Sequence, residues 1–523
     1  MILLALKISS VIRTLSRRSS ILVALLAGAL NVFSFAPFHL WPLQILSLAL
    51  LFLLVAKNTQ TSLRRSAILG WAYGFSGIFF GVSWLLILMV RYNDLPIWLS
   101  LIGMALLAGF LALPAAIAML IGAFLQRRWK LSPFLTFMLV LPATWALTEW
   151  SRGWVVTGFP WLVSGYAHTG SPLAGYAPVL GVYGVGWISA LISGALALFF
   201  LPSQNWKKIS ALLVFVLGSG LLLGQIAWTQ PHGNPITARL LQGNVDQGLK
   251  FDRDRVMESL EMYQTMIAAA PADLIATPET ALPMLSSQLP PDYLPRLNAF
   301  AQSSNSRLIV GVVAHDGDNL YANSVLGFGS EYQQQTYRYD KHHLVPFGEF
   351  IPFGFRWFVN LMKIPFGELT GGVKVPLAMQ VKDQLILPNI CYETLFGEEI
   401  AHQLRDQSNT KIGAATILLN VSNMAWYGDS IAMPQHLQIS QMRVLETGRA
   451  MLQVTNTGAT AFINAQGEIV AQLKPLTRDT LSAQVQGMTG LTPYIRFGNA
   501  MMVLLALLSL LLAFGISKFR TGN

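Results

Sequence analysis

Charged residues are scarce in this chain of 523 residues. Only 11% are Asp, Glu, Lys or Arg, whereas a soluble domain carries about a quarter. Apolar residues make up 53% of the chain, so the composition excludes an ordinary soluble protein and indicates a membrane protein. Acidic residues are rarest at the start, where residues 1–230 contain only Asp94 and Glu149 against fourteen Lys and Arg.

Residues 231–493 have the opposite balance, with 23 acids and 18 bases. The net charge of +10 therefore comes from the segments that flank apolar runs, where basic residues set orientation in a bilayer. The positive charge is thus no argument for nucleic-acid binding.

Cysteine is almost absent, because Cys391 is the only one in the chain. A single cysteine excludes an intramolecular disulfide, and with it a disulfide-stapled fold. A lone cysteine is more often a small buried hydrophobe than a functional group. Its neighbours must therefore decide between these two interpretations.

Long apolar runs are present, and each reaches or nearly reaches the ~20 residues that a helix needs to cross a bilayer. We expect eight spans, at residues 19–36, 41–56, 66–90, 95–125, 132–150, 172–201, 208–228 and 495–517. The first is predicted to be an uncleaved anchor, since no convincing cleavage site follows it. Basic loops alternate with loops poor in Lys and Arg. The alternation predicts cytoplasmic termini and residues 229–493 on the outside, which is the periplasm for a bacterial inner membrane.

Residues 229–493 differ from their flanks, because short β-like runs alternate with helical patterns. The runs are residues 239–245, 273–277, 307–314, 384–390 and 415–421. Residues 253–270 place Val256, Leu260, Tyr263 and Ile267 on one helical face, and residues 436–450 are a second helix candidate. This alternation predicts one α/β domain. The predicted divisions are a membrane domain at 1–230, a catalytic domain at 231–490 and a final span with its tail at 491–523.

Cys391 follows the apolar residues of the run 384–390, so it is expected at or just past the end of a strand, a common place for functional groups. Glu279 ends another β-like run, and Lys341 lies in a polar segment. A nucleophilic thiol needs a base or a positive neighbour. Glu279 is the candidate base and Lys341 the candidate positive group.

At these segments the chain resembles the nitrilase superfamily, whose catalytic set is Glu, Lys and Cys in that order, and more closely its membrane-bound branch, the apolipoprotein N-acyltransferase family. The resemblance rests on motifs spread over nearly the whole chain: TEWSRGWVVTGFPW at 148–161, QGN at 242–244, PE at 278–279, KHHLVPFGEF at 341–350, ICYE at 390–393, SNMAWYGDS at 422–430, the segment 446–456 and GLTPY at 490–494. It implies an α-β-β-α sandwich for the α/β domain. Phe251 and Met424 depart from the family pattern, which has Trp and an acid at these places.

The resemblance also implies roles for individual residues. Cys391 would be the nucleophile, Glu279 the general base and Lys341 the oxyanion stabiliser. Further residues are assigned roles from the resemblance or from their places in the chain. The supporting groups are Glu349, Tyr392 and Glu393, and the substrate contacts are Phe251, Trp357, Phe358, Asn423, Trp426 and Trp154. No metal or organic cofactor is required by this set.

The expected reaction has a lipid donor and an amine acceptor. Cys391 would attack a phospholipid ester, with phosphatidylethanolamine the expected donor, and hold the acyl chain as a thioester. The resemblance implies that the acceptor is the N-terminal amine of a diacylglyceryl-cysteine on a lipoprotein. An α-amine with a pKa of about 7.7–8.0 is partly neutral at neutral pH, whereas a Lys amine near 10.4 is mostly protonated.

Several residues have two interpretations. His342 and His343 suggest a metal pair, but adjacent residues of an extended segment face opposite ways. Glu149 and Arg152, at i,i+3 spacing, predict either a plain ion pair at a helix end or a lipid headgroup contact. Trp154 belongs with other tryptophans that are typical of an interfacial aromatic belt as well as of a lipid contact.

Two other classes of function remain open. A membrane-tethered amidase or nitrilase would resolve the acyl-enzyme with water, and the candidate triad alone does not exclude it. The apolar loop 353–366 argues for a lipid substrate and is predicted to be a lid that dips into lipid. A scaffold or transporter should carry paired charges or broken helices inside its spans. These runs are nearly free of charge in their interiors, and the full candidate triad is present.

Overall fold

The computed structural model describes residues 14–58, 62–92, 94–201, 205–248, 250, 253–317, 320–332, 335–354, 356 and 368–521. The chain forms two compact units. The first contains Met1–Val90, Asp94–Ala227 and Phe497–Asn523, and the second contains Arg91–Asn93 and Trp228–Arg496. The two units are described separately below.

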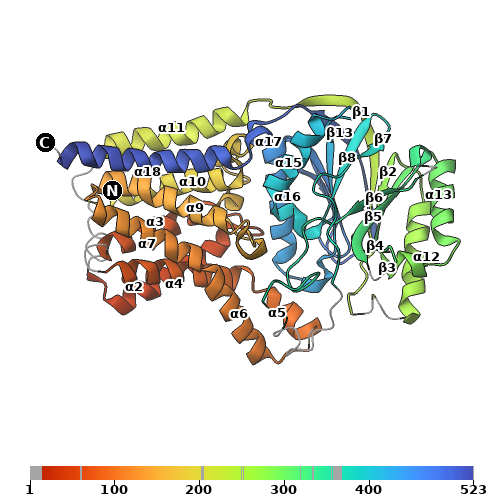
Figure 1. The fold of residues 1–523 in the computed structure, drawn as a ribbon, viewed down its shortest axis with the longest axis horizontal. Coiled ribbons are helices and arrows are strands. Elements are labelled where there is room, and N and C mark those ends of the chain that lie inside the picture. Colours follow the sequence, from red (N-terminus) through yellow and green to blue (C-terminus); the bar gives the residue numbers. More distant parts are fainter. Residues whose placement is uncertain are drawn as a thin grey trace. The chain divides into compact units, whose positions relative to one another are not determined.

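Helices make up the first unit, in which α18 packs against α9 and α10 although it comes from the other end of the chain (Figure 1). Its principal helices are α2 (Arg17–Asn31), α3 (Pro42–Asn58), α4 (Leu63–Gly81), α5 (Leu85–Ile87), α6 (Ile97–Leu111), α7 (Leu113–Arg128), α8 (Pro133–Leu135), α9 (Leu141–Ser151), α10 (Ala177–Phe199), α11 (Trp206–Gly224) and α18 (Ala500–Thr521).

Small residues allow these helices to approach closely, as is usual for helix pairs in a bilayer. A Cβ on Gly28 of α2 would come within 2.0 Å of the Tyr73 carbonyl oxygen on α4. A Cβ on Gly70 of α4 would come within 2.3 Å of the Ala115 carbonyl oxygen on α7. Glycine at these two positions therefore sets how closely α4 packs against both neighbours.

Four helices among the described residues are long and apolar enough to cross a membrane: Ile97–Arg128, Pro172–Phe199, Trp206–Gly224 and Ala500–Phe519. A fifth candidate is the pair Leu63–Gly81 and Leu85–Tyr92, which is bent by 61°. The helix Pro42–Lys57 is apolar but shorter. The prediction of long apolar helices is thus confirmed for this part of the chain, while their crossing of a membrane and the full count of eight spans stay predictions.

Two sheets form the centre of the second unit. The first has the order β13-β1-β2-β4-β5-β6, with β3 also paired to β4, and the second has the order β12-β11-β10-β9-β8-β7. The strands are β1 (Gln230–Gln242), β2 (Leu274–Ala276), β3 (Leu282–Leu285), β4 (Arg307–His315), β5 (Tyr321–Phe328), β6 (Tyr337–Asp340), β7 (Met379–Val381), β8 (Gln384–Ile390), β9 (Ile417–Ser422), β10 (Ala450–Thr455), β11 (Ala461–Ile463), β12 (Ile469–Gln472) and β13 (Asp479–Thr489).

The sheets face each other across one buried cluster to which both contribute, including Leu240 and Ile309 from the first and Ile390 and Leu419 from the second. Helices α12 (Arg253–Ala268) and α13 (Tyr293–Ser303) cover the outer face of the first sheet. Helices α15 (Gly397–Ser408) and α16 (Ala432–Thr447) cover the second. The layers are therefore helix, sheet, sheet and helix (Figure 1).

The predicted helical face of residues 253–270 is confirmed, because Val256, Leu260, Tyr263 and Ile267 are all buried in α12. The second helix, predicted at residues 436–450, begins and ends earlier in the structure than predicted. Helix α16 begins at Ala432 and ends at Thr447, where Gly448 takes a left-handed φ of 62° and stops it. The residues that follow Gly448 enter β10 instead.

The strand predicted at residues 239–245 also begins and ends earlier in the structure. Strand β1 begins at Gln230 because it pairs antiparallel with β13, more than two hundred residues later. It ends at Gln242, and Asn244 has a left-handed φ of 51° that is incompatible with a continued strand.

Candidate active site

The lone thiol lies at a sharp turn. Strand β8 ends at Ile390, and a short 3-10 helix, η9 (Cys391–Leu395), begins at once. Cys391 has a left-handed φ of 51°, a conformation that is uncommon for a residue with a side chain and that is often found at functional sites. Its carbonyl oxygen accepts hydrogen bonds from Asn420 Nδ2 and His436 Nε2, both at 3.4 Å. The strand-end position predicted for Cys391 is confirmed.

A buried amide network supports this turn. Asn420 Nδ2 also donates to Asn389 Oδ1 and to Thr394 Oγ1, both at 2.6 Å. Thr394 Oγ1 in turn donates to Asn389 Oδ1 at 2.8 Å. These residues come from β8, η9 and β9, so neighbouring segments of the second sheet together hold the left-handed conformation of Cys391.

The predicted base and cation meet although 62 positions separate them in the chain. Glu279 follows β2 and Lys341 follows β6 directly. Lys341 Nζ lies 3.7 Å from Glu279 Oε1 and 2.9 Å from Glu349 Oε1. Lys341 is 1% exposed, so its ammonium is held between two carboxylates away from bulk water. The electrostatic interaction of Cys391 with Glu279, Lys341 and Glu349 places the thiol in the same cluster.

Each carboxylate of this cluster is oriented by fixed donors. Asn323 Nδ2 donates to Glu279 Oε1 at 2.7 Å and to Glu349 Oε1 at 2.8 Å, which joins the two acids. The backbone N–H of Asn423 donates to Glu279 Oε2 at 2.8 Å. The backbone N–H of Val345 donates to Glu349 Oε2 at 2.8 Å. Glu349 thus lies in the same cluster as Glu279 and Lys341.

The charges of the cluster set the resting form of the thiol. Burial raises the pKa of Cys391, and the carboxylates of Glu279 and Glu349 raise it further. Lys341 lowers this pKa, but by less than the two carboxylates together raise it. Burial lowers the pKa of Lys341, but Glu349 and Glu279 more than offset this and bring it above its usual value. The resting pair is therefore a neutral thiol and a charged ammonium, so attack by sulfur requires a base.

Glu393 accepts four hydrogen bonds. Oε1 accepts from the backbone N–H groups of His342 at 2.7 Å and His343 at 3.1 Å. Oε2 accepts from Tyr339 Oη and from the backbone N–H of Ile390, both at 2.6 Å. Burial raises the pKa of Glu393, and these donors oppose the change. Glu393 thereby joins the segment after Lys341 to the strand end before Cys391.

The neighbouring aromatic and imidazole rings have structural partners. Tyr392 is buried, with its ring 5.2 Å from that of Phe396 and 5.8 Å from that of His343. His343 Nδ1 lies 2.8 Å from Glu399 Oε1, whereas His342 Nδ1 lies 2.8 Å from the Gly372 carbonyl oxygen. The two imidazoles thus have different partners. No group of three or more His, Cys, Asp or Glu able to hold a metal ion is found among the residues that the structure describes.

The residues predicted to contact the substrate lie in different parts of the structure. Asn423 lies in the cluster, where its backbone orients Glu279 and its side chain donates to Gln247 Oε1 at 2.6 Å. Trp426 is half-buried in the short helix η10 (Met424–Tyr427). Trp154 belongs to the first unit and is 56% exposed. Three further predicted contacts lie outside the described residues: Phe251, Trp357 and Phe358.

The sequence interpretation did not include Asn323 or Lys250. Lys250 is 1% exposed, and its Nζ donates to Thr280 Oγ1 at 2.5 Å and to the Glu279 carbonyl oxygen at 3.4 Å. Burial lowers the pKa of Lys250 to about 8. Its position directly before Phe251, which departs from the family pattern, was the available signal. Asn323 lies in β5 with no motif around it, so only the sheet order brings it to the carboxylates.

Two family models match this chain. Residues 27–195 match the apolipoprotein N-acyltransferase N-terminal domain, and residues 237–494 match the carbon-nitrogen hydrolase family. The second match covers the two-sheet unit and supports a nitrilase-like fold for the C-terminal half.

Three relatives that match nearly the whole chain are named apolipoprotein N-acyltransferases. An apolipoprotein N-acyltransferase of Ralstonia nicotianae is 47% identical, covering 91% of this chain and 90% of that protein. The apolipoprotein N-acyltransferase of Nitrosomonas europaea is 39% identical, and the match covers 95% of this chain and 96% of that protein. The apolipoprotein N-acyltransferase of Bordetella bronchiseptica is 39% identical, and the match covers 96% of this chain and 97% of that protein.

Proposed function

Because the chain belongs to the apolipoprotein N-acyltransferase family, we propose that it moves an acyl chain from a phospholipid to a lipoprotein through a thioester on Cys391. The acceptor is the N-terminal amine of the diacylglyceryl-cysteine. One observation carries the proposal: Lys341 lies buried between Glu279 and Glu349, beside the single thiol of the chain.

In the first half-reaction, Cys391 sulfur attacks the ester carbonyl carbon while Glu279 removes the thiol proton. The carbon–sulfur bond forms and the carbon–oxygen bond of the ester breaks. Glu279 then returns the proton to the departing oxygen, so a lysophospholipid leaves with a free hydroxyl. The raised pKa of Cys391 makes this base necessary, since a thiol must lose its proton as it attacks.

In the second half-reaction, the neutral amine of the lipoprotein attacks the thioester carbon. The carbon–nitrogen bond forms and the carbon–sulfur bond breaks. Glu279 takes the proton released by nitrogen and gives it to the sulfur of Cys391, which restores the resting thiol. Each half-reaction passes through a tetrahedral oxyanion, which the ammonium of Lys341 stabilises.

Lys341 suits this role because its charge is fixed in advance. Glu349 and Glu279 keep it protonated, and Glu349 holds it by a 2.9 Å hydrogen bond. A donor aimed at developing charge in a dry site is usually the largest single contribution to catalysis, with ~3–4 kcal/mol lost when it is removed. Glu349 and Glu393 act as positioning residues in this scheme.

The membrane assignment belongs to the same proposal. We place the chain in the inner membrane of a bacterium, with eight spans divided between residues 1–230 and 491–523. Residues 231–490 then form the periplasmic catalytic domain, as an α-β-β-α sandwich. The alternation of basic loops supports this orientation. Phosphatidylethanolamine is the proposed donor, and neither step requires a metal or an organic cofactor.

Kinetic order separates this function from a membrane-tethered amidase or nitrilase. An acyltransferase of this kind shows ping-pong kinetics, with phospholipid alone giving one lysophospholipid per enzyme. Turnover resumes when a peptide with a free, lipidated N-terminal Cys is added, and an acetylated peptide does not restore it. Steady release of fatty acid from phospholipid alone, at the rate of the peptide reaction, would make water the acceptor and replace the proposal by the amidase.

A further inference from the structure

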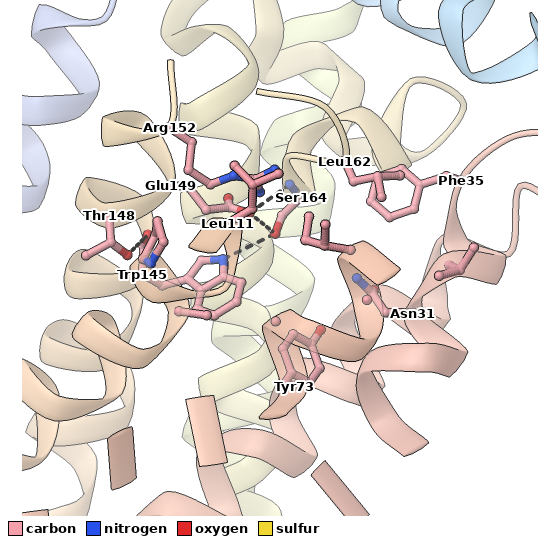
Figure 2. A pocket seen from close by; sticks show the side chains of 16 residues that line it. Asn31, Phe35, Tyr73, Leu111, Trp145, Thr148, Glu149, Arg152, Leu162 and Ser164 are labelled. Atoms are coloured by element: carbon pink, nitrogen blue, oxygen red, sulfur yellow. Dashed lines mark hydrogen bonds between the residues drawn. The ribbon is translucent and has the colours of Figure 1, made fainter. Parts of the chain in front are cut away.

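Buried polar side chains tie separate segments of the chain together in both units. In the first unit, Glu149 Oε1 accepts hydrogen bonds from the backbone N–H of Ser164 at 3.0 Å and from Ser164 Oγ at 2.8 Å. Figure 2 shows this link, with the Trp145 indole donating to the same hydroxyl at 3.2 Å. In the second unit, Asn456 forms a link of this kind between segments that carry groups of the candidate active site.

Asn456 lies one position past the end of β10 and is 1% exposed. Strand β10 runs parallel to β9 and pairs Thr455 with Ser422, so the next residues, Asn456 and Asn423, lie beside each other. The backbone N–H of Asn456 donates to the Ser422 carbonyl oxygen at 3.1 Å. Its own carbonyl oxygen accepts from the backbone N–H of Asn244 at 2.9 Å. Asn456 therefore joins the second sheet to the segment that follows β1 of the first sheet.

The side-chain amide of Asn456 pairs with the backbone of one residue, Val245. Its Oδ1 accepts from the Val245 N–H at 2.9 Å, and its Nδ2 donates to the Val245 carbonyl oxygen at 2.7 Å. The same Nδ2 donates to Asn423 Oδ1 at 3.1 Å. Because the N–H only donates and the carbonyl oxygen only accepts, the pairing needs an amide. A carboxylate in this place would keep the acceptor but would turn its second oxygen toward two other oxygens.

The first segment that Asn456 holds is the β1 loop, which comprises the described residues 244–248 and Lys250. Lys250 Nζ donates to the Glu279 carbonyl oxygen at 3.4 Å and to Thr280 Oγ1 at 2.5 Å. Thr280 has a left-handed φ of 45°, which is uncommon for a residue with a side chain and persists only where the surroundings support it. The β1 loop thus holds the backbone of the predicted general base.

The second segment that Asn456 holds is the β9 loop, residues 423–427. The backbone N–H of Asn423 donates to Glu279 Oε2 at 2.8 Å, so this loop holds the carboxylate itself. Asn423 Nδ2 also donates to Gln247 Oε1 at 2.6 Å, which is a second tie between the two loops. A change at Asn456 therefore reaches Glu279 along both loops.

We propose that Asn456 is a positioning residue for the general base, which holds the two loops at the spacing that keeps Glu279 ready to accept the proton of Cys391. It acts through Val245 and Asn423 rather than on the reacting atoms. The inference rests on the proposed function, in which Glu279 removes the thiol proton. A misplacement of about 1 Å can cost about 100-fold in rate, so loss of this amide should slow attack by the thiol about 10- to 100-fold.

The test follows acylation of Cys391 in the full-length chain by p-nitrophenyl butyrate. This activated ester requires deprotonation of the thiol but neither a phospholipid nor a lipopeptide. Release of p-nitrophenol gives the rate, and Cys391→Ala gives the background. Asn456→Asp retains the size and one acceptor but loses the donor, so it should lower the rate about 10- to 100-fold. Asn456→Ser removes the amide without adding a charge and should slow acylation as well, also where the aspartate variant does not fold.

Gln407→Glu is the matched control. Gln407 is buried in α15, where its Nε2 donates to the Pro376 carbonyl oxygen at 2.8 Å and its Oε1 accepts from the backbone N–H of Ala415 at 3.1 Å. The same exchange of amide for carboxylate therefore breaks a similar link between two segments that do not hold Glu279. The rate for the folded control should stay within twofold of the wild type, and a tenfold loss would overturn the proposal.

A double variant separates positioning from a general loss of stability. Glu279→Gln alone should slow acylation by about 100- to 10,000-fold, the usual contribution of a general base. Once the base is absent its position no longer matters, so adding Asn456→Asp should slow the reaction less than twofold further. Losses that multiply would overturn the proposal, as would an Asn456→Asp chain that reacts at the wild-type rate.

The same measurements keep this proposal apart from the proposed function. If the ester acylates Cys391 with the expected pattern but a phospholipid never does, the proposed donor is wrong while the role of Asn456 stands. If a phospholipid acylates Cys391 but the losses multiply, the role of Asn456 is wrong while the proposed function stands.

Discussion

Asn323→Leu tests how the two carboxylates of the candidate active site are held. Leucine has a similar size but donates no hydrogen bond, so both Glu279 and Glu349 lose the donor that Asn323 Nδ2 supplies at 2.7 and 2.8 Å. Asn323 is 4% exposed, so water does not readily replace the amide. The substitution therefore destabilises the ionised form of the general base.

The magnitude follows from the strength of these bonds. A hydrogen bond to a charged group contributes about 1.5–3 kcal/mol, and 1.36 kcal/mol corresponds to a factor of ten in rate. Asn323→Leu removes such a bond from the general base. The rate of acyl transfer should therefore fall by about 10- to 100-fold.

The assay follows transfer from a fluorescent phospholipid to a diacylated lipopeptide between pH 5 and pH 8.5. The variant should be slower by this factor across the range. Asn409→Leu, at an exposed position after α15, is the matched control and should leave the profile unchanged. A variant that keeps the wild-type rate would refute the role assigned to Asn323.

Three further changes have defined outcomes. Lys250→Met should slow acyl transfer yet raise the free energy of unfolding at pH 7 by about 1 kcal/mol, because the buried ammonium, with a folded pKa of about 8 against 10.5, costs about 3 kcal/mol below pH 8 and the two lost hydrogen bonds offset about 2. Denaturation at several pH values should show this gain reach zero near about pH 9 and become a loss toward pH 10.5. Glu393→Gln should lower both activity and thermal stability, by on the order of 3 kcal/mol, because an amide cannot accept all four hydrogen bonds; unchanged stability would contradict this. Replacing Trp357 and Phe358 by Ser should weaken phospholipid use more than it lowers the melting temperature, and equal losses would indicate a loop packed on its own domain.

The sequence predicted the parts of the site that local patterns encode. Cys391 and Glu279 follow apolar runs, so their positions beyond strand ends were accessible from hydropathy. The face of α12 was accessible from helical spacing. The family motifs then joined Lys341 and Glu349 to the same site.

Features that depend on distant pairing could not be predicted in this way. Asn323 reaches two carboxylates because β5 lies between β4 and β6, an order that no local pattern specifies. The start of β1 depends on its antiparallel partner β13 at the other end of the domain. The burial of Glu149 depends on how the helices of the first unit pack around it, and spacing alone left its role open.

The central claim is that Cys391 carries the acyl chain, and a mass spectrum of the intact protein after incubation with phospholipid, but without acceptor, tests it most directly. The account predicts a mass increase of one acyl chain, mapped by proteolysis to Cys391 and removed both by hydroxylamine and by a lipopeptide with a free N-terminal amine. The Cys391→Ala chain should acquire no such mass. A wild-type chain that transfers acyl groups but never carries one on Cys391, or an alanine variant that keeps substantial activity, would contradict the account.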